Sequence, residues 1–319
     1  RNLLPYLEPD SLPDEDPLSN CRLPVLDELP RGIRKRWPVA EPRKIADQLT
    51  QLSQFPVDHR VAPGAIRGGA ESAERAWHTF LEKKLPCYGE SRNDPDMDAT
   101  SGLSPYLHFG QISVHQVFAE TMRRTGWSPE RVSAKASGSS HDWWGVDESV
   151  ESFLDELITW RELGYNMCSR NADYAAYDSL PPWARQTLAK HADDPREHVY
   201  TLDEFESAAT HDPLWNAAQR QLVREGRIHN YLRMLWGKKI LEWSPSPQSA
   251  LATLIELNNQ YALDGRNPNS YSGIFWVLGR YDRAWGPERP VFGTIRYMSS
   301  ENTARKVRLK DYLRRYGPD

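Results

Sequence analysis

The chain has 319 residues and a mass of 36.7 kDa, enough to bury a substantial core in one large domain or two unequal ones. The mean hydropathy is −0.71 and no run of about 18 apolar residues occurs, so no membrane span is predicted. The net charge of −4, taken alone, argues against a nucleic-acid partner, and three cysteines without metal-ligand spacing predict neither a metal site nor a disulfide framework.

The first 63 residues are predicted to be a linker. Eight prolines fall between Pro5 and Pro42, and acidic residues cluster at 10–16. Only Arg43–Phe55 has helical periodicity. We therefore predict a Pro-rich linker with one short helix over 1–63, followed by a folded domain over 64–319.

From Gly69 onward, apolar residues recur at helical spacing. Few β-branched runs alternate with period two, and no strand–helix–strand punctuation appears. The fold class is therefore predicted to be all-α, a helical cluster in which short connections pack helices as antiparallel neighbours. The predicted helices are Ala70–Leu85, Glu151–Cys168, Leu214–Arg224, Ile228–Trp243 and Pro247–Tyr261.

Thr100–Gly110 contains three hydroxyl residues in five positions, a glycine, and Pro105 at an expected helix start. Backbone N–H groups and hydroxyls at such a turn can bind a phosphate. The same residues also fit an ordinary N-capping turn, so the pattern alone leaves both interpretations open.

Ser133–Ser149 interrupts the helical pattern with a polar, Ser- and Gly-rich stretch that carries Trp143 and Trp144. The two tryptophans could contact a partner or fold back onto the core.

Near the C-terminus, 280–315 contains ten Lys or Arg residues against four acids. This stretch fits either a solvated helical face or a phosphate-binding track.

Several segments resemble the photolyase and cryptochrome family. Thr100–Ser113 is similar to the flavin-phosphate motif of this family. Four later segments resemble its class II branch specifically: His211–Ala217, Arg233–Trp243, Asp264–Asn269 and Arg289–Met298. The resemblance extends from about Leu49 to the C-terminus. It implies a helical domain enclosing a folded FAD, which in its photoexcited reduced form donates an electron that splits cyclobutane pyrimidine dimers in DNA. It also implies a preceding antenna domain, which is absent from these residues and could be supplied by a separate chain.

The resemblance implies a set of flavin-binding residues. Arg233 and Asp264 would form an ion pair beside the isoalloxazine ring, although two such charges also fit a surface pair. Asn258 matches the asparagine that the family places near flavin N5 and O4, and Asn269 is a second candidate for that role. The full implied set is Tyr88, Thr100, Ser101, Gly102, Leu103, Ser104, Arg233, Asn258, Asp264 and Gly265.

A lesion pocket is implied as well. Glu156 and Trp160 lie four residues apart and are predicted to share one helix face. The resemblance makes Glu156 the carboxyl group that hydrogen-bonds the dimer, although a Glu and a Trp at this spacing also fit an ordinary helix flank. Aromatic walls suit bases that are flipped out of a duplex. The implied substrate-binding residues are Trp160, Met234, Trp276, Trp285 and Arg296.

Three of the 12 tryptophans are implied to carry electrons to the flavin. Trp236 would be nearest the flavin, Trp215 in the middle, and Trp243 the terminal donor near solvent. Without the resemblance, a large aromatic core explains these residues equally well.

The sequence departs from the class II pattern at Val277–Ala284, which is one residue shorter and lacks a histidine. This difference keeps open a cryptochrome-like photoreceptor that binds FAD without repairing DNA, and a protein that has lost the cofactor. We expect a cytoplasmic monomer, nucleoid-associated if bacterial, with FAD as cofactor, DNA containing pyrimidine dimers as partner, and neither membrane nor metal.

Overall fold

The computed structural model describes residues 28–39, 56–135 and 141–318. The described residues belong to two compact units, which divide between Ala62 and Pro63. In the smaller unit they form α1 (Arg31–Arg36), all of whose side chains are exposed. The predicted helix Arg43–Phe55 lies outside the described residues.

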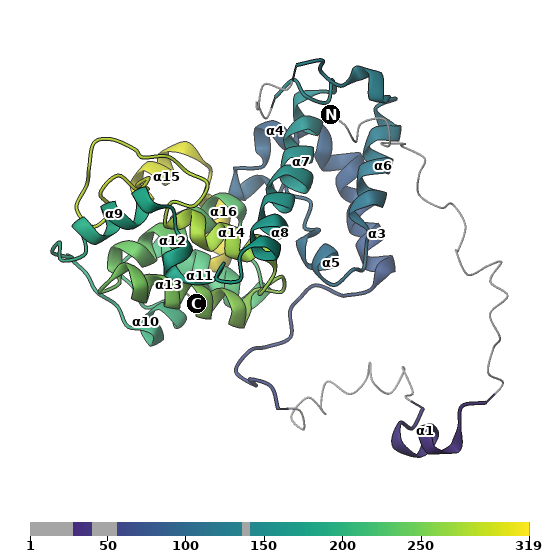
Figure 1. Ribbon diagram of the computed structural model, residues 1–319, viewed down its shortest axis with the longest axis horizontal. Coiled ribbons are helices and arrows are strands. Elements are labelled where there is room, and N and C mark those ends of the chain that lie inside the picture. Colours follow the sequence, from purple (N-terminus) through teal and green to yellow (C-terminus); the bar gives the residue numbers. More distant parts are fainter. Residues whose placement is uncertain (1–27, 40–55, 136–140, 319) are drawn as a thin grey trace. The chain divides into compact units, whose positions relative to one another are not determined.

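The larger unit is helical, which confirms the predicted all-α class. Its described residues contain one isolated β-bridge, between Arg289 and Gly293, and no strand. The longer helices are α3 (Ala70–Thr79), α6 (Val114–Arg124), α8 (Arg161–Arg170), α9 (Pro182–Lys190), α11 (Pro213–Glu225), α12 (Asn230–Trp243), α13 (Pro247–Tyr261) and α14 (Pro268–Val277) (Figure 1). The shorter ones are α4 (Tyr88–Ser91), α5 (Ser104–His108), α7 (Glu148–Leu154), α10 (Leu202–Glu206), α15 (Ser300–Lys306) and α16 (Lys310–Tyr316).

Two predicted helices are interrupted by π-helical turns. The first predicted helix continues from α3 into the π-helix η3 (Phe80–Lys84), and the second divides into α7, the π-helix η7 (Asp155–Trp160) and α8. A π-helical turn inserts one additional residue without ending the helix, and such turns are frequent at functional sites. A search for 3.6-residue periodicity cannot find them. Single 3₁₀ turns complete the unit: η4 (Leu85–Cys87), η5 (Pro95–Met97), η6 (Pro129–Arg131) and η8 (Tyr177–Ser179).

The α11–α12 hairpin has clear sequence determinants. Asp212 accepts hydrogen bonds from the backbone N–H groups of Leu214 and Trp215, which fixes the start of α11. Gly226 ends that helix with φ 68°, and a Cβ there would lie 2.5 Å from Cγ of Leu263. Glycine is therefore needed both for the left-handed conformation and for the close approach. The turn packs α11 against α12, as the short connection predicted.

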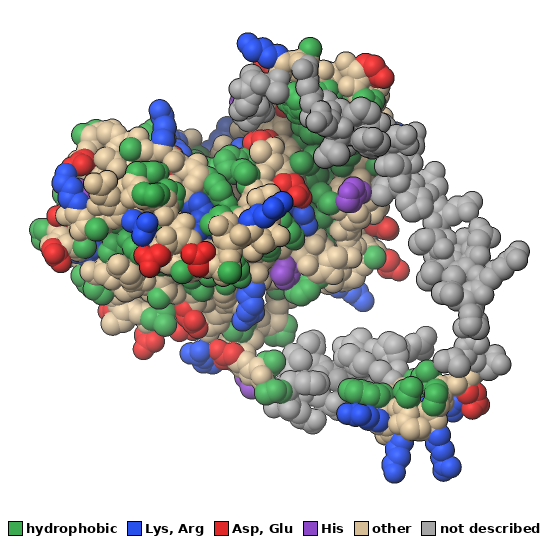
Figure 2. Space-filling view, in the orientation of Figure 1, with side chains coloured by type: hydrophobic (Ala, Val, Ile, Leu, Met, Phe, Trp, Pro, Cys, Tyr) green, Lys and Arg blue, Asp and Glu red, His purple; other side chains and the backbone are tan. Residues whose placement is uncertain are grey.

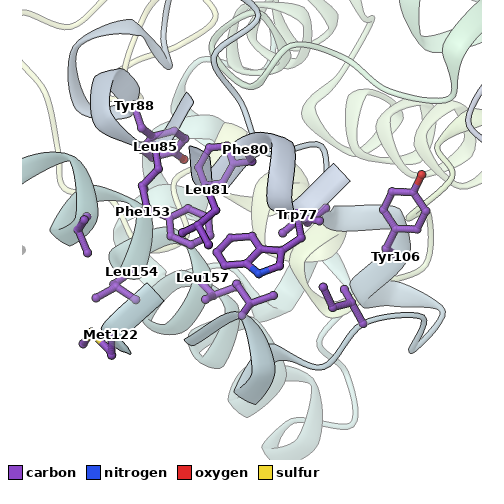
Figure 3. Close-up of a cluster of buried hydrophobic side chains, with 14 of the residues drawn as sticks. Trp77, Phe80, Leu81, Leu85, Tyr88, Tyr106, Met122, Phe153, Leu154 and Leu157 are labelled. Carbon is purple, nitrogen blue, oxygen red and sulfur yellow. The ribbon is translucent and has the colours of Figure 1, made fainter. Parts of the chain in front are cut away.

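Aromatic rings from α3, η3 and α7 form one part of the core. Figure 3 shows Trp77, Phe80 and Phe153 pointing toward one another. The Trp77 and Phe153 rings stack with centroids 6.0 Å apart, and the Phe80 and Phe153 centroids are 4.8 Å apart. The edge of Tyr88 closes this cluster toward α4. Some of the surplus tryptophans are therefore core residues, as the simpler interpretation of the composition proposed.

The polar stretch around Trp143 and Trp144 folds back at its C-terminal end. Trp144 packs beside Trp127 and Phe118. The Trp127 Nε1 donates to the backbone carbonyl of Trp144 at 2.7 Å. The buried carboxylate of Glu151 accepts the backbone N–H groups of Asp142, Trp144 and Gly145. Of the two roles proposed for this stretch, Trp144 therefore takes the core one. Residues 136–140 lie outside the described part.

Acidic and basic side chains are interspersed on the face shown in Figure 2. This mixture agrees with a net charge close to zero for the whole chain. In the part of the chain that the structure describes, every helix is too short or too polar to cross a membrane.

Candidate functional site

A cavity of about 520 Å³ lies inside the larger unit. Its volume falls in the range of small-molecule and cofactor sites, roughly 300–1,000 Å³. Side chains from α5, η7, α12, α13, α14 and α16 line it. The implied site residues that line it are Tyr88, Thr100, Ser101, Gly102, Leu103, Ser104, Glu156, Trp160, Arg233, Met234, Trp236, Asn258, Asp264, Trp276 and Arg296. Four residues of the implied set are outside this lining: Gly265, Trp285, Trp215 and Trp243.

The hydroxyl-rich turn forms one wall of the cavity. Gly102 has φ 67° and the space around its Cα is open, so the left-handed conformation, and not crowding, is what favours glycine here. The Ser101 Oγ accepts the Leu103 N–H at 3.4 Å, and Ser104 begins α5 with Pro105 behind it. The turn is therefore a local capping turn whose hydroxyl and N–H groups also lie beside a cavity. The capping and the phosphate-binding interpretations are compatible with each other.

The implied Arg233–Asp264 pair is placed differently from the expectation. Both residues line the cavity, but Arg233 donates to the Asn230 Oδ1 at 2.8 Å, and the described residues show no ion pair between Arg233 and Asp264. Asn258 is buried and donates to the Asn259 Oδ1 at 3.2 Å. Asn269 also reaches the cavity.

The π-helical turn η7 carries Glu156 and Trp160 toward the same cavity. Glu156 accepts a hydrogen bond of 2.6 Å from the Arg92 guanidinium, and the pair is partly buried. Arg92 also lies over the Tyr88 ring, 5.6 Å from its centroid. Burial raises the pKa of Tyr88, and the Glu156 charge raises it further, so this phenol stays protonated at neutral pH.

Trp160 and Trp276 both line the cavity and contact each other, with ring centroids 4.4 Å apart at an interplanar angle of 40°. Trp276 comes from α14, so two helices distant in sequence supply one aromatic corner. Trp285 lies apart from the lining: its Nε1 donates to the Asp282 Oδ1 at 2.9 Å, and the Arg296 guanidinium lies 5.1 Å from its ring centroid. Arg296 therefore connects Trp285 to the cavity wall.

The three implied relay tryptophans lie close together. Trp236 lines the cavity, and the Trp215 Nε1 donates to its backbone carbonyl at 3.0 Å. The Trp215 and Trp243 centroids are 6.0 Å apart. Trp215 thus contacts both of the others, in the implied order. Trp243 is only 3% exposed, so the solvent-accessible end expected there is not the indole itself.

Sequence reasoning missed several cavity residues. Arg92 follows the very short helix α4, where no periodic pattern exists, and its only signal was the charge itself. His229 was missed because it precedes α12 as an ordinary cap residue. Both of its ring nitrogens are buried and lack a partner among the described residues, and burial lowers its pKa to about 4. Tyr312 and Tyr316 of α16 also line the cavity, brought there by long-range packing on α11.

The residues present fit a large cofactor with phosphate and aromatic parts. The hydroxyls and N–H groups of the Thr100–Ser104 turn suit phosphates, and the rings of Tyr88, Trp160 and Trp276 suit an aromatic ring system. No group of three His, Cys, Asp or Glu side chains in the described ranges could hold a metal ion.

Comparison with known proteins connects this cavity to a family. The chain is 41% identical over 264 residues to a deoxyribodipyrimidine photo-lyase of Methanothermobacter thermautotrophicus, covering 83% of this chain and 54% of that protein. It is 44% identical over 288 residues to a deoxyribodipyrimidine photo-lyase of Oryza sativa subsp. japonica, covering 90% of this chain and 52% of that protein. More distant matches include plant cryptochromes. No family model matches the chain.

The fold agrees with the sequence matches. A bacterial class III photolyase from Agrobacterium tumefaciens superposes with a TM-score of 0.60 at 20% identity, covering 88% of this chain and 50% of that one. The chain therefore spans about half the length of the relatives that it matches. With an all-α fold, a cofactor-sized cavity and relatives of this identity, the chain belongs to the photolyase/cryptochrome family.

Proposed function

We propose that this chain binds FAD in the cavity and repairs cyclobutane pyrimidine dimers in DNA when illuminated. One observation carries the proposal: a single cavity unites the hydroxyl-rich turn, Glu156 and the Trp160–Trp276 corner. The names of the relatives at 41% and 44% identity support the same reaction. FAD, when bound, supplies the light absorption and the electron transfer, so the chain has to bind, orient and exclude water.

The protein's own tasks follow from the described contacts. The Thr100–Ser104 turn would hold the phosphates with hydroxyls and N–H groups, and Asn258 would orient the flavin ring through its amide. Arg233 would add positive charge to the same cavity wall and favour an anionic cofactor. The Asn230 contact of Arg233 uses one guanidinium nitrogen, and five donors are available in all.

The lesion would enter beside the Trp160–Trp276 corner. Stacking on these rings would replace the stacking that two bases lose on leaving the duplex. Glu156 would hydrogen-bond a carbonyl of the dimer through its carboxyl group. Met234 would add an adaptable apolar contact. The Arg92 bond holds the Glu156 carboxyl at the cavity before any substrate arrives.

Three finer statements belong to this proposal. The motifs in Arg233–Trp243 and Arg289–Met298 support the class II branch. An antenna domain, which the resemblance implies, would be a further partner of this chain, which spans about half of its relatives' length. We also propose that the protein acts as a cytoplasmic monomer on DNA, associated with the nucleoid if the source is bacterial.

The test is a repair assay. Protein that has been loaded with FAD and chemically reduced is mixed with an oligonucleotide containing one thymine dimer and illuminated with blue light. Loss of dimers only in the light supports the enzyme. A yellow protein that binds FAD but leaves dimers intact would indicate the cryptochrome-like photoreceptor, which the shortened Val277–Ala284 string favours. A protein that takes up no flavin would reject both.

A further inference from the structure

Lys238 is a fully buried charged residue that the proposed chemistry leaves unused. Its side chain is 0% exposed, and its Nζ donates a hydrogen bond of 2.6 Å to the backbone carbonyl of Val277. Burial lowers its pKa to about 7. Placing an ammonium group in a core costs free energy, whereas a methionine or leucine would pack there without that cost. A lysine at this position therefore lowers the stability of the fold, which suggests that its contact with α14 has a specific local role.

The acceptor lies at a specific place. Val277 is the last residue of α14, and the preceding residue is Trp276 of the cavity corner. The end of a helix leaves backbone carbonyls without intrahelical partners, and a cation there is also favoured by the helix dipole. Next to the lysine, Gly237 brings α12 so close that a Cβ would lie 2.4 Å from Cγ2 of Val277. Lys238 and Gly237 together join α12 to the end of α14.

Trp276 depends on this backbone for its orientation. Its Nε1 is buried and has no hydrogen-bond partner among the described residues, so no polar contact fixes the indole. Its ring contacts Trp160, but Trp160 is held independently through its own Nε1, which donates to Asp155 at 2.9 Å. The direction of the Trp276 indole therefore follows from where the end of α14 is held.

The turn after α14 is held from a second side. The Arg280 guanidinium lies 3.7 Å from the Phe275 ring centroid and donates to the Tyr174 carbonyl at 2.9 Å. The turn continues to Asp282, whose carboxylate acts on the Lys238 charge and also accepts the Trp285 Nε1. Lys238 is thus connected to both implied lesion tryptophans of this region. It contacts the backbone next to Trp276, and its charge interacts with the Asp282 carboxylate that accepts the Trp285 indole.

We propose that Lys238 is a positioning residue that fixes the end of α14, and with it the Trp276 face on which a flipped dimer would stack. The inference rests on the proposed function, since it assigns the lysine to the lesion side of the cavity. Its consequence is selective: loss of the tether should weaken recognition of the dimer, but should leave general DNA binding, flavin binding and the light-driven step of a bound dimer largely intact.

The experiment compares the FAD-loaded wild type with Lys238→Met and the matched variant Lys239→Met. Lys239 is the next residue, nearly as buried, and pairs with Glu242 at 2.7 Å instead of with α14. Dissociation constants are measured in the dark for dimer-containing and undamaged oligonucleotides, together with repair at saturating dimer. For Lys238→Met we expect dimer affinity to fall about tenfold, the scale of one base–aromatic stacking contact, with undamaged affinity and saturated repair unchanged. Lys239→Met should keep the wild-type preference for the dimer.

Hydrogen exchange provides a readout that requires no DNA. The N–H groups of Leu278, Gly279 and Arg280 donate to carbonyls of Phe275 and Trp276, so their protection reports the α14 end directly. Protection should fall in Lys238→Met and persist in Lys239→Met. Full protection together with unchanged dimer affinity in Lys238→Met would overturn the proposal. If that variant does not fold, Lys238→Gln replaces it and is held to the same two outcomes. A wild type without any preference for the dimer would instead overturn the proposed function, and the role of the tether with it.

Discussion

The indole Nε1 of Trp215 donates a 3.0 Å hydrogen bond to the backbone carbonyl of Trp236, which joins α11 to α12 directly beside the cavity. Trp215 also lies 6.0 Å from Trp243, centroid to centroid. Trp215 thus links the cavity-lining Trp236, through a bond to its backbone, to the buried Trp243, through a ring contact. The arrangement fits an electron relay as well as a core, and the two roles predict different consequences of substitution.

Trp236→Phe should abolish photoreduction of oxidised FAD in the presence of an external reductant, because phenylalanine is not readily oxidised. Repair by pre-reduced protein should survive. The sequence alone predicts an almost unchanged melting temperature, since an aromatic ring is kept. The structure modifies that expectation: the Trp236 Nε1 donates to the Gln219 Oε1 at 2.9 Å, and leaving this buried oxygen unpaired should cost about 1–3 kcal/mol.

Trp77→Phe is the matched control for this variant. Trp77 is fully buried, donates to the Glu120 carboxylate, and belongs to the aromatic cluster of α3 and α7. It should lose similar stability while photoreducing at the parental rate. If Trp236→Phe also photoreduced at the parental rate, the relay assignment would be wrong and these tryptophans would be core residues only.

Replacing Ser101 and Ser104 together with aspartate should release the flavin. Both side chains line the cavity, and two carboxylates would oppose phosphates by charge as well as volume. Flavin content is measured by absorbance after gel filtration. The control is the pair Ser113→Asp and Ser299→Asp, two N-cap positions away from the cavity, where aspartate caps equally well. Full flavin content in the first pair would remove the turn from the cofactor site.

Neutralising Arg305, Lys306 and Arg308 should weaken binding to damaged and undamaged duplex alike. All three are exposed, although Arg308 lies 3.6 Å from the Asp94 carboxylate and is the least available of them. The slope of log K against log salt should flatten by up to roughly 0.9 for each lost phosphate contact. Arg75, Lys83 and Arg124, exposed on the α3–α6 side, serve as a control of equal charge. An unchanged slope would place the DNA-binding track elsewhere.

The sequence predicted the helical class and most of the long helices because amphipathic spacing and capping residues such as Asp212 and Gly226 are local signals. It did not predict the π-helical turns, because an inserted residue leaves the apolar pattern almost intact. The cavity residues Arg92 and Tyr312 and the buried Lys238 could not be predicted either. Each of them bonds to a residue distant in the chain: Arg92 to Glu156, Tyr312 to Gln221 and Lys238 to Val277. A single sequence does not reveal such long-range pairs.

Motif resemblance predicted which residues would meet, but not how they would contact one another. Arg233 and Asp264 both reach the cavity, yet Arg233 bonds to Asn230 of its own helix turn. Trp285 was implied as a pocket wall and instead lies on the Asp282 carboxylate behind Arg296. Residue identity fixes the available chemistry, whereas the geometry of an irregular segment such as 283–299 depends on long-range contacts that no local sequence pattern predicts.

The last prediction concerns acid stability and His229. Burial lowers the pKa of this histidine from 6.5 to about 4, so between these values the unfolded chain binds a proton that the folded chain does not. Stability must therefore rise with pH across this window, by up to about 1.4 kcal/mol for each pH unit, and be lost as the pH falls from 6.5 toward 4. His229→Gln removes the titration and should reduce the slope of unfolding free energy against pH there. Urea denaturation at pH 4.5 and 6.5, at constant flavin content, measures it. His78→Gln, an exposed position on α3, is the control and should keep the parental slope. Equal slopes in all three proteins would mean that His229 opens to solvent and takes up its proton before the protein unfolds.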